Sequence, residues 1–96
     1  MPKLTDPEIA ERLKTVPQWT REGETIHREF TCPTFPDAIA FLVRVGFDAE
    51  AADHHPDLQI SYKKVTVNWS THDAGGLTEK DFAGAKQSDM IAARTR

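Results

Sequence analysis

The chain has 96 residues, which is enough for one domain with a single modest hydrophobic core. It carries 12 Lys and Arg against 15 Asp and Glu, a net charge of -3, and it has no basic run, so we expect no direct binding to nucleic acid. It contains no apolar run near the roughly 18 residues of a membrane span and no signal-peptide pattern, so we expect a soluble cytoplasmic protein that binds no membrane.

The N-terminal third predicts a helix followed by a β-hairpin. Thr5 is a suitable N-cap, and two further helix-start signals follow it, Pro7 in the first turn and Glu8 at the capping-box position. Pro17 prevents that helix from continuing, and polar and apolar residues then alternate around a short turn at Gly23. The expected elements are a helix over about residues 6–14 and a hairpin of strands 18–21 and 25–31.

The remainder of the chain repeats the order of helix and hairpin and then adds a last helix. Thr34 again offers a cap, with Pro36 in the first turn and Asp37 at the third position. A turn at residues 63–64 separates two stretches of alternating residues. The expected elements are a helix over about residues 35–53, strands over 58–62 and 65–70, and a helix over about 79–94. Residues 1–96 therefore predict one α+β domain of order α-β-β-α-β-β-α, a four-stranded antiparallel sheet with helices packed on one face.

The predicted helix 35–53 is apolar over more of its surface than one sheet can cover. Its expected core stripe consists of Phe35, Ile39, Leu42, Val45 and Ala49. Val43 and Phe47 lie beyond that stripe, so a second packing partner is implied. Two-fold association is the commonest way to cover such a patch, and open sheet edges offer a further contact. We therefore expect a homodimer or homotetramer.

Three of the four histidines, His54, His55 and His72, fall within 19 positions of the chain. Because an unperturbed histidine has a pKa of about 6.5, such a cluster is a candidate proton-transfer site. Pro56 disfavours helical geometry at His55, so the adjacent pair is expected at a corner between the long helix and the next strand. Glu50 lies one helical turn before His54, where its carboxylate is expected either to form a salt bridge at the rim or to act as a functional acid near the histidines.

Three kinds of site fit this cluster. In the first, one histidine removes a proton and another donates one, without a metal. In the second, three imidazoles and the carboxylate of Glu50 or Asp73 bind zinc. The adjacency of His54 and His55 counts against zinc, because neighbouring side chains usually diverge. In the third, the histidine pair makes structural hydrogen bonds at the corner, and the spacing alone leaves all three open.

The spacing of these residues resembles the signature of the pterin-4a-carbinolamine dehydratases, also called 4a-hydroxytetrahydrobiopterin dehydratases. The matching run is Glu50-x3-His54-His55-Pro56-x5-Tyr62-x9-His72-x8-Asp81. All seven specified positions fit, across 32 residues. The resemblance extends over about residues 10–92 and includes Trp19 ahead of the first hairpin. One departure is Trp69, which stands where the family commonly has a smaller apolar residue.

The resemblance implies an enzyme that removes water from a 4a-hydroxytetrahydropterin to give quinonoid dihydropterin, in tetrahydrobiopterin recycling, with no cofactor and no metal. On this analogy His54 and His72 would do the acid/base work and His55 would bind or orient the substrate. Glu50 would polarise a histidine or accept hydrogen bonds from the pterin. The residues expected to contact the substrate are Trp19, Pro56, Ser70, Thr71 and Asp81. Asp81 is expected either to orient His72 or to cap its helix.

Protein interaction is the competing function class. Members of this family are also known as dimerisation cofactors of a homeodomain transcription factor, and the wide apolar surface of helix 35–53 is consistent with such a role. The same surface serves self-association equally well. A histidine substitution that abolishes turnover but preserves partner binding would separate the two functions.

Overall fold

The computed structural model describes residues 2–94 and has the α+β fold expected from the sequence. The elements are α1 (Asp6–Leu13), β1 (Thr20–Glu22), β2 (Thr25–Thr31), α2 (Phe35–Ala52), β3 (Asp57–Ser61), β4 (Lys64–Trp69) and α3 (Glu79–Arg94). A short 3-10 helix that the sequence did not predict, η1 (His72–Ala74), lies between β4 and α3. The predicted order α-β-β-α-β-β-α is therefore confirmed. No described helix is long and apolar enough to cross a bilayer.

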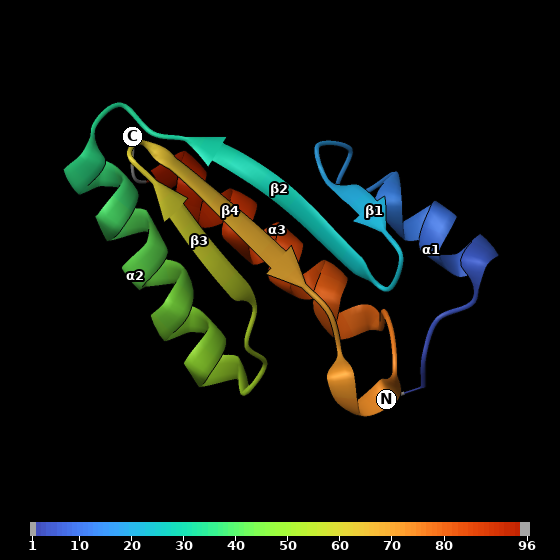
Figure 1. Cartoon of the computed structure of the whole chain (residues 1–96). Helices are drawn as coiled ribbons and strands as arrows, with labels where there is room; N and C mark the ends of the chain where they lie inside the picture. The colour runs from blue at the N-terminus through green and yellow to red at the C-terminus, as the bar shows by residue number, and fades with distance from the viewer. Residues whose placement is uncertain (1, 95–96) are drawn as a thin grey trace.

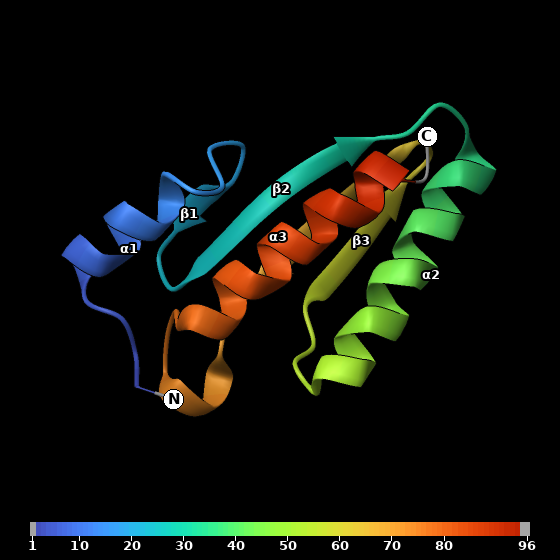
Figure 2. The same cartoon turned by 180° about the vertical axis from the view of Figure 1, so that it is seen from behind.

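The four strands form one antiparallel sheet in the order β1-β2-β4-β3 (Figure 1). Ile26 of β2 lies opposite Trp69 of β4, and Phe30 lies opposite Val65. Figure 2 shows α3 crossing the face of the sheet, with α2 on the β3 side and α1 beside β1. Because side chains alternate along a strand, the residues opposite one another in β2 and β4 point to the same face of the sheet. Trp69, at the C-terminal end of β4, therefore points to the face that the helices cover.

The core lies between the sheet and the helices. Phe30 packs against Trp19 and Phe41, with ring centroids 6.0 and 4.7 Å away. Arg28 shares the inward face of β2 with Phe30, and its charge is paired with Asp89 of α3 at 2.7 Å. The carboxylate of Asp89 also accepts a hydrogen bond from Trp19 Nε1 at 2.9 Å. A polar group on the inward face is thus tolerated because its partners are present.

Helix α2 buries a stripe that overlaps only in part with the expected one, at Val45 and Ala49. Its buried residues are Ala38, Phe41, Val45 and Ala49. Phe35 and Ile39, assigned to the core from sequence, are 45% and 39% exposed, so that part of the prediction was wrong. The buried face contains Phe41 and Val45 as well as the alanines, and Phe35 and Ile39 lie beyond its edge. We call Phe35, Ile39, Val43 and Phe47 the outer stripe of α2.

The hairpin between β3 and β4 turns one residue earlier than the sequence suggested. Ser61 pairs with Lys64, so the turn consists of residues 62–63 and not 63–64. Tyr62 has a φ of 52° and its side chain is exposed. A two-residue hairpin commonly needs a positive φ in the turn, and this requirement overrides the alternation that placed Tyr62 in the strand.

Candidate active site

The two adjacent histidines follow a left-handed residue that ends α2. Asp53 has φ 53° and ψ 41°, and its N–H donates to the carbonyl oxygens of Ala49 and Glu50. The N–H of His54 donates to the same Ala49 oxygen at 3.1 Å. This closure stops the helix and turns the chain toward β3, with Pro56 directly before the strand. The corner expected from the sequence is present.

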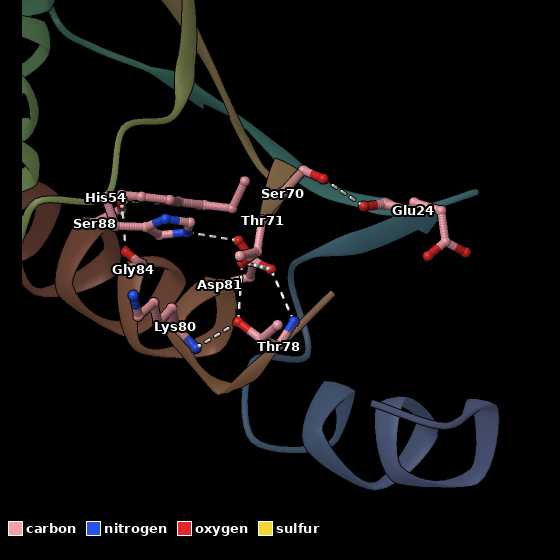
Figure 3. A network of polar contacts seen from close by, with 10 residues as sticks. Glu24, His54, Ser70, Thr71, Thr78, Lys80, Asp81, Gly84 and Ser88 are labelled. Atoms are coloured by element: carbon pink, nitrogen blue, oxygen red, sulfur yellow. Dashed lines mark hydrogen bonds and ion pairs between the residues drawn. The ribbon is translucent and has the colours of Figure 1, made fainter. Parts of the chain in front are cut away.

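The pair diverges, as adjacent side chains usually do. The side chain of His54 is turned inward and only 12% exposed, whereas that of His55 is 58% exposed. His54 Nε2 lies 2.8 Å from Oδ1 of Asp81, a wholly buried residue near the start of α3. Figure 3 shows this contact at the centre of a polar network between β4 and α3. Asp81 therefore orients His54 and not His72, which corrects one of the two expectations for this residue. The other expectation, a capping role at its own helix, is met by the hydrogen bond from the Thr78 N–H to Asp81 Oδ2.

Each described group that contacts the Asp81 carboxylate donates a hydrogen bond to it. Oδ2 accepts from Thr71 Oγ1 at 2.9 Å and from the Thr78 N–H at 3.0 Å. Since Thr71 gives its only hydroxyl hydrogen to Asp81, the hydroxyl of Thr78, 2.9 Å away, must donate to Thr71. The N–H of Lys80 donates in turn to Thr78 Oγ1 at 3.2 Å. These donations all run toward the carboxylate.

This direction of donation sets the tautomer of His54. A carboxylate has only acceptor sites, so the bond between His54 and Asp81 requires the hydrogen on Nε2. In the neutral imidazole Nδ1 is then the acceptor nitrogen, and no described residue hydrogen-bonds to it. Asp81 thus leaves His54 with one nitrogen free to take a proton.

The imidazole of His54 also lies against an aromatic ring. Its centroid is 5.2 Å from that of Trp69, and the two planes are 21° apart. Trp69 Nε1 donates to Ser88 Oγ at 3.3 Å, and that hydroxyl donates to the Gly84 carbonyl at 2.8 Å. A side chain at Gly84 would not fit, because its Cβ would lie 2.6 Å from Cε2 of Trp69.

A cavity of about 510 Å³ lies between α2 and α3, and His54 and Trp69 form part of its wall. Most of its lining is apolar, with Val45, Ala49 and Ile91 among the residues involved. Polar groups on the wall include Lys80 and a hydrogen bond of 3.0 Å from Gln87 to Asp48. A cavity that is mainly apolar with a few polar groups suits a flat organic ring.

Glu50 and His55 form a separate pair on the surface. His55 Nε2 lies 2.7 Å from Glu50 Oε1, and the Glu50 side chain is 77% exposed. The expectation that Glu50 contacts a histidine is met, through His55. Exposed ion pairs contribute roughly 0–1 kcal/mol, so this contact adds little to stability and leaves both groups accessible to a substrate.

The third histidine is brought to the same end of the sheet but not into this hydrogen-bond network. His72 begins η1, is exposed, and makes no side-chain hydrogen bond to another described residue. Its neighbours differ: Thr71 is buried and bonded to Asp81, whereas Ser70 Oγ donates to the carbonyl of Glu24 at 2.9 Å. Among residues 2–94, no three His, Cys, Asp or Glu side chains group closely enough to hold a metal ion.

Trp19 is placed away from these groups. It is buried beside Phe30 and bonded to Asp89, and it does not line the cavity between α2 and α3. The aromatic residue that the site does contain is Trp69, which the sequence flagged only as a departure from the family pattern. The alternation of β4 placed its side chain on the core face, but the contact with His54 depends on where the end of α2 meets the sheet.

Comparisons with known proteins identify the family to which this chain is related. The family model described as pterin 4 alpha carbinolamine dehydratase matches residues 2–91. A relative from Roseiflexus sp. strain RS-1, provisionally named pterin-4-alpha-carbinolamine dehydratase, is 56% identical over 89 residues, 93% of this chain and 96% of the relative. A relative from Chloroflexus aurantiacus with the same provisional name is 54% identical over 91 residues, covering 95% of this chain and 98% of its own.

Two solved structures share the fold. The crystal structure of a transcriptional coactivator/pterin dehydratase from Brucella melitensis superposes with a TM-score of 0.90 at 34% identity, covering 94% of this chain and 98% of the other. A pterin dehydratase-like protein described as a RuBisCO assembly factor in the alpha-carboxysome has a TM-score of 0.64 at 19% identity, covering 77% and 86%. The second likeness concerns the fold alone. Because the family model spans nearly the whole chain and the relatives share more than half of its residues, the chain belongs to the pterin 4 alpha carbinolamine dehydratase family.

Proposed function

We propose that this protein is a dehydratase that removes water from a 4a-hydroxytetrahydropterin and yields quinonoid dihydropterin. The observation that carries the proposal is the His54 imidazole, held by the buried Asp81 with Nδ1 left free, in the wall of a cavity of suitable size. Membership of the family supports the substrate class. The proposal treats residues 1–96 as one catalytic domain and needs no cofactor or metal.

The reaction requires two proton transfers. The C4a–O bond breaks as the hydroxyl takes a proton and leaves as water, and loss of the N5 proton completes the C4a=N5 double bond. In our assignment His54 accepts the N5 proton at Nδ1, because its other nitrogen is committed to Asp81. His72, exposed at the start of η1, donates to the leaving hydroxyl. Positioned acid/base groups of this kind typically contribute about 10²–10⁴-fold in rate.

The remaining residues act in binding and geometry. His55 and Glu50 form an accessible pair that can hydrogen-bond to the polar edge of the pterin. Ser70 and Thr71 hold the strand end from which η1 and His72 start, and Pro56 sets the corner. We keep Trp19 out of the substrate contacts, because it is buried and already bonded to Asp89.

A direct assay tests the proposal. A 4a-hydroxytetrahydropterin would be generated freshly and its dehydration followed by absorbance, with and without the protein. Acceleration that His54→Ala removes, while the variant stays folded, supports the assignment. Wild-type protein that leaves the spontaneous rate unchanged would overturn it. We place this activity in tetrahydrobiopterin recycling in the cytoplasm, where such a carbinolamine is the substrate to be cleared.

A second candidate function is protein interaction through the outer stripe of α2. Its four apolar side chains recur every four residues and are all at least 39% exposed. A solved relative is titled both transcriptional coactivator and pterin dehydratase, so a binding role beside catalysis is consistent with the family. We propose that a second copy of the chain binds to this stripe and gives a homodimer or homotetramer. The stripe is continuous and uncharged, which suits self-association.

A further inference from the structure

We propose that Trp69 is a positioning residue for the proton-transferring histidine, in addition to being part of the core. The indole face holds the plane of the His54 imidazole while Asp81 holds its Nε2 atom. This inference rests on the proposed dehydratase function for its kinetic consequence, but the positioning itself is a property of the unliganded protein and is testable without turnover.

The indole is itself held from two sides. Its Nε1–H donates to Ser88 Oγ, and the hydroxyl of Ser88 is fixed by its own donation to the carbonyl of Gly84. The ring also lies on Gly84, where a Cβ would come within 2.6 Å of Cε2. Trp69 is buried, and the strand β4 that carries it is central in the sheet. The indole is therefore a rigid surface, with one edge bonded to α3.

One hydrogen bond does not define the orientation of an imidazole. The terminal torsion of a histidine has a broad, roughly two-fold energy profile, so a single contact at Nε2 leaves the ring plane free to tilt. The Trp69 ring, 5.2 Å away and 21° from parallel, removes that freedom. Because the stack uses the ring face, both nitrogens of His54 stay available, one for Asp81 and one for the substrate.

The direction of Nδ1 is what this positioning controls. A proton acceptor must point at the proton it removes, and misplacement of a reacting group by about 1 Å costs about 10²-fold in rate. Trp69 and His54 also share the wall of the cavity between α2 and α3. A smaller residue at position 69 would leave space beneath the imidazole, into which the ring could tilt while its bond to Asp81 was kept.

Substitutions at position 69, with a matched control, separate positioning from simple core packing. Trp69→Leu removes the flat ring, Trp69→Phe restores one, and Gly84→Ala pushes the indole from its place without changing it. Val67→Ala serves as the control, since Val67 is buried on the same face of β4 two residues earlier and belongs to no part of the site. The thermal midpoint, kcat and KM would be measured for each variant.

We expect kcat to fall by about 10–100-fold in Trp69→Leu, because misplacing a reacting group by up to about 1 Å costs up to about 10²-fold in rate. KM should change less than kcat, because Trp69 forms only part of the cavity wall and affects the reacting atoms through His54. Gly84→Ala should shift kcat in the same direction, and Trp69→Phe should recover most of the loss. Val67→Ala should lower the thermal midpoint with kcat unchanged. Equal kcat in Trp69→Leu and Val67→Ala would overturn the proposal.

A second measurement works without activity. Proton NMR of the histidine ring C–H signals, assigned with His54→Gln, should show the His54 signals displaced upfield by the stacked indole. The exposed His55 provides an internal reference. The displacement should vanish in Trp69→Leu and largely persist in Trp69→Phe. If wild-type protein lacks dehydratase activity but shows this displacement, the proposed function is wrong and the positioning of His54 by Trp69 is still supported. If the displacement is absent, the positioning fails whatever the activity.

Discussion

His54 and Asp81, 27 residues apart in the sequence, meet through a hydrogen bond of 2.8 Å at a carboxylate that no solvent reaches. A buried carboxylate is costly unless donors surround it, and Asp81 has donors on both oxygens. The same donors decide which nitrogen of His54 carries its hydrogen. Stability and the tautomer of a candidate catalytic histidine therefore depend on one side chain.

Asp81→Asn should lower both turnover and stability. The amide has a single acceptor oxygen for three donors, so its NH2 group must face one of them. If it faces His54, the imidazole changes tautomer and loses its free Nδ1, a fault that costs roughly 10²-fold or more in comparable dyads. The unsatisfied donor should also lower the free energy of unfolding by about 1–3 kcal/mol. Dehydration kinetics and urea denaturation measure the two effects.

Asp89→Asn is the matched control for that variant. Asp89 also lies on α3 and accepts two hydrogen bonds, from Trp19 and Arg28, where Asp81 accepts three, and it touches no histidine. The Asp89→Asn variant should therefore be less stable than the wild type and have an unchanged kcat. A similar kcat in Asp81→Asn and Asp89→Asn would show that the His54 contact has no role in the reaction.

The histidines themselves should differ in importance. His54→Ala and His72→Ala should each lower turnover by about 10²–10⁴-fold with the fold retained, which circular dichroism would verify. Because the uncatalysed dehydration is not slow, it adds to the rate measured for each variant, and the measured loss will be smaller than the true loss of catalysis. His27, the fourth histidine, lies on β2 away from the cluster, so His27→Ala should behave as wild type. Turnover near the wild-type rate in both single variants would contradict the acid/base assignment.

Local signals predicted most of the secondary structure. Thr5 and Thr34 were expected as caps, and both side chains accept the predicted backbone hydrogen bonds. These interactions span three residues and are visible in sequence. The same reasoning found the corner at Pro56. It placed Glu50 next to His54, whereas the histidine that Glu50 contacts is His55, on the surface.

Contacts between distant segments could not be predicted in this way. Thr78 and Asp81 look like an ordinary helix start, and they do interact as one, but the partner on the other side of Asp81 comes from the end of α2. Trp69 was assigned inward by alternation, without its histidine neighbour. Periodicity gives the direction of a helix face only roughly, so the buried stripe of α2 was rotated and Phe35 was misplaced.

Activity should be independent of metal. The proposed chemistry moves only protons, and His54 and His55 diverge at the corner, so the cluster does not present three ligands to one point. Prolonged dialysis against a chelator should leave kcat unchanged, and added zinc should not raise it. Elemental analysis before and after dialysis verifies that metal was removed. Loss of activity that zinc restores would contradict the metal-free mechanism.

The contact between α1 and α3 should make stability depend on pH. Arg12 donates two hydrogen bonds to Glu79, and the guanidinium holds the pKa of the Glu79 carboxyl below its ordinary value of 4.5. A carboxyl with a lowered pKa in the folded state stabilises it above the unfolded pKa, and this is lost as the pH falls through the folded pKa. Glu79→Gln should therefore lower the thermal midpoint slightly at pH 7.

The difference between wild type and Glu79→Gln should shrink as the pH falls from the ordinary carboxyl value of 4.5 to the lowered pKa of Glu79, and should be absent below it. It should also shrink at high salt, which screens exposed pairs. Glu11→Gln offers a comparison, because Glu11 pairs with Lys14 within a single turn and connects no two elements. A Glu79→Gln difference that grows toward acid pH would contradict this account.

The outer stripe of α2 should hold copies of the chain together. Phe47 is 73% exposed in the isolated chain, and leaving such a side chain in water forgoes roughly 1.5–3 kcal/mol of burial. Phe47→Asp should therefore lower the oligomeric state, since a buried unpaired carboxylate costs several kcal/mol. Met90→Asp, at an exposed apolar residue of α3 outside the stripe, should leave it unchanged. Light scattering at micromolar concentration reads the mass of each variant, and a monomeric wild-type protein would contradict the proposed self-association.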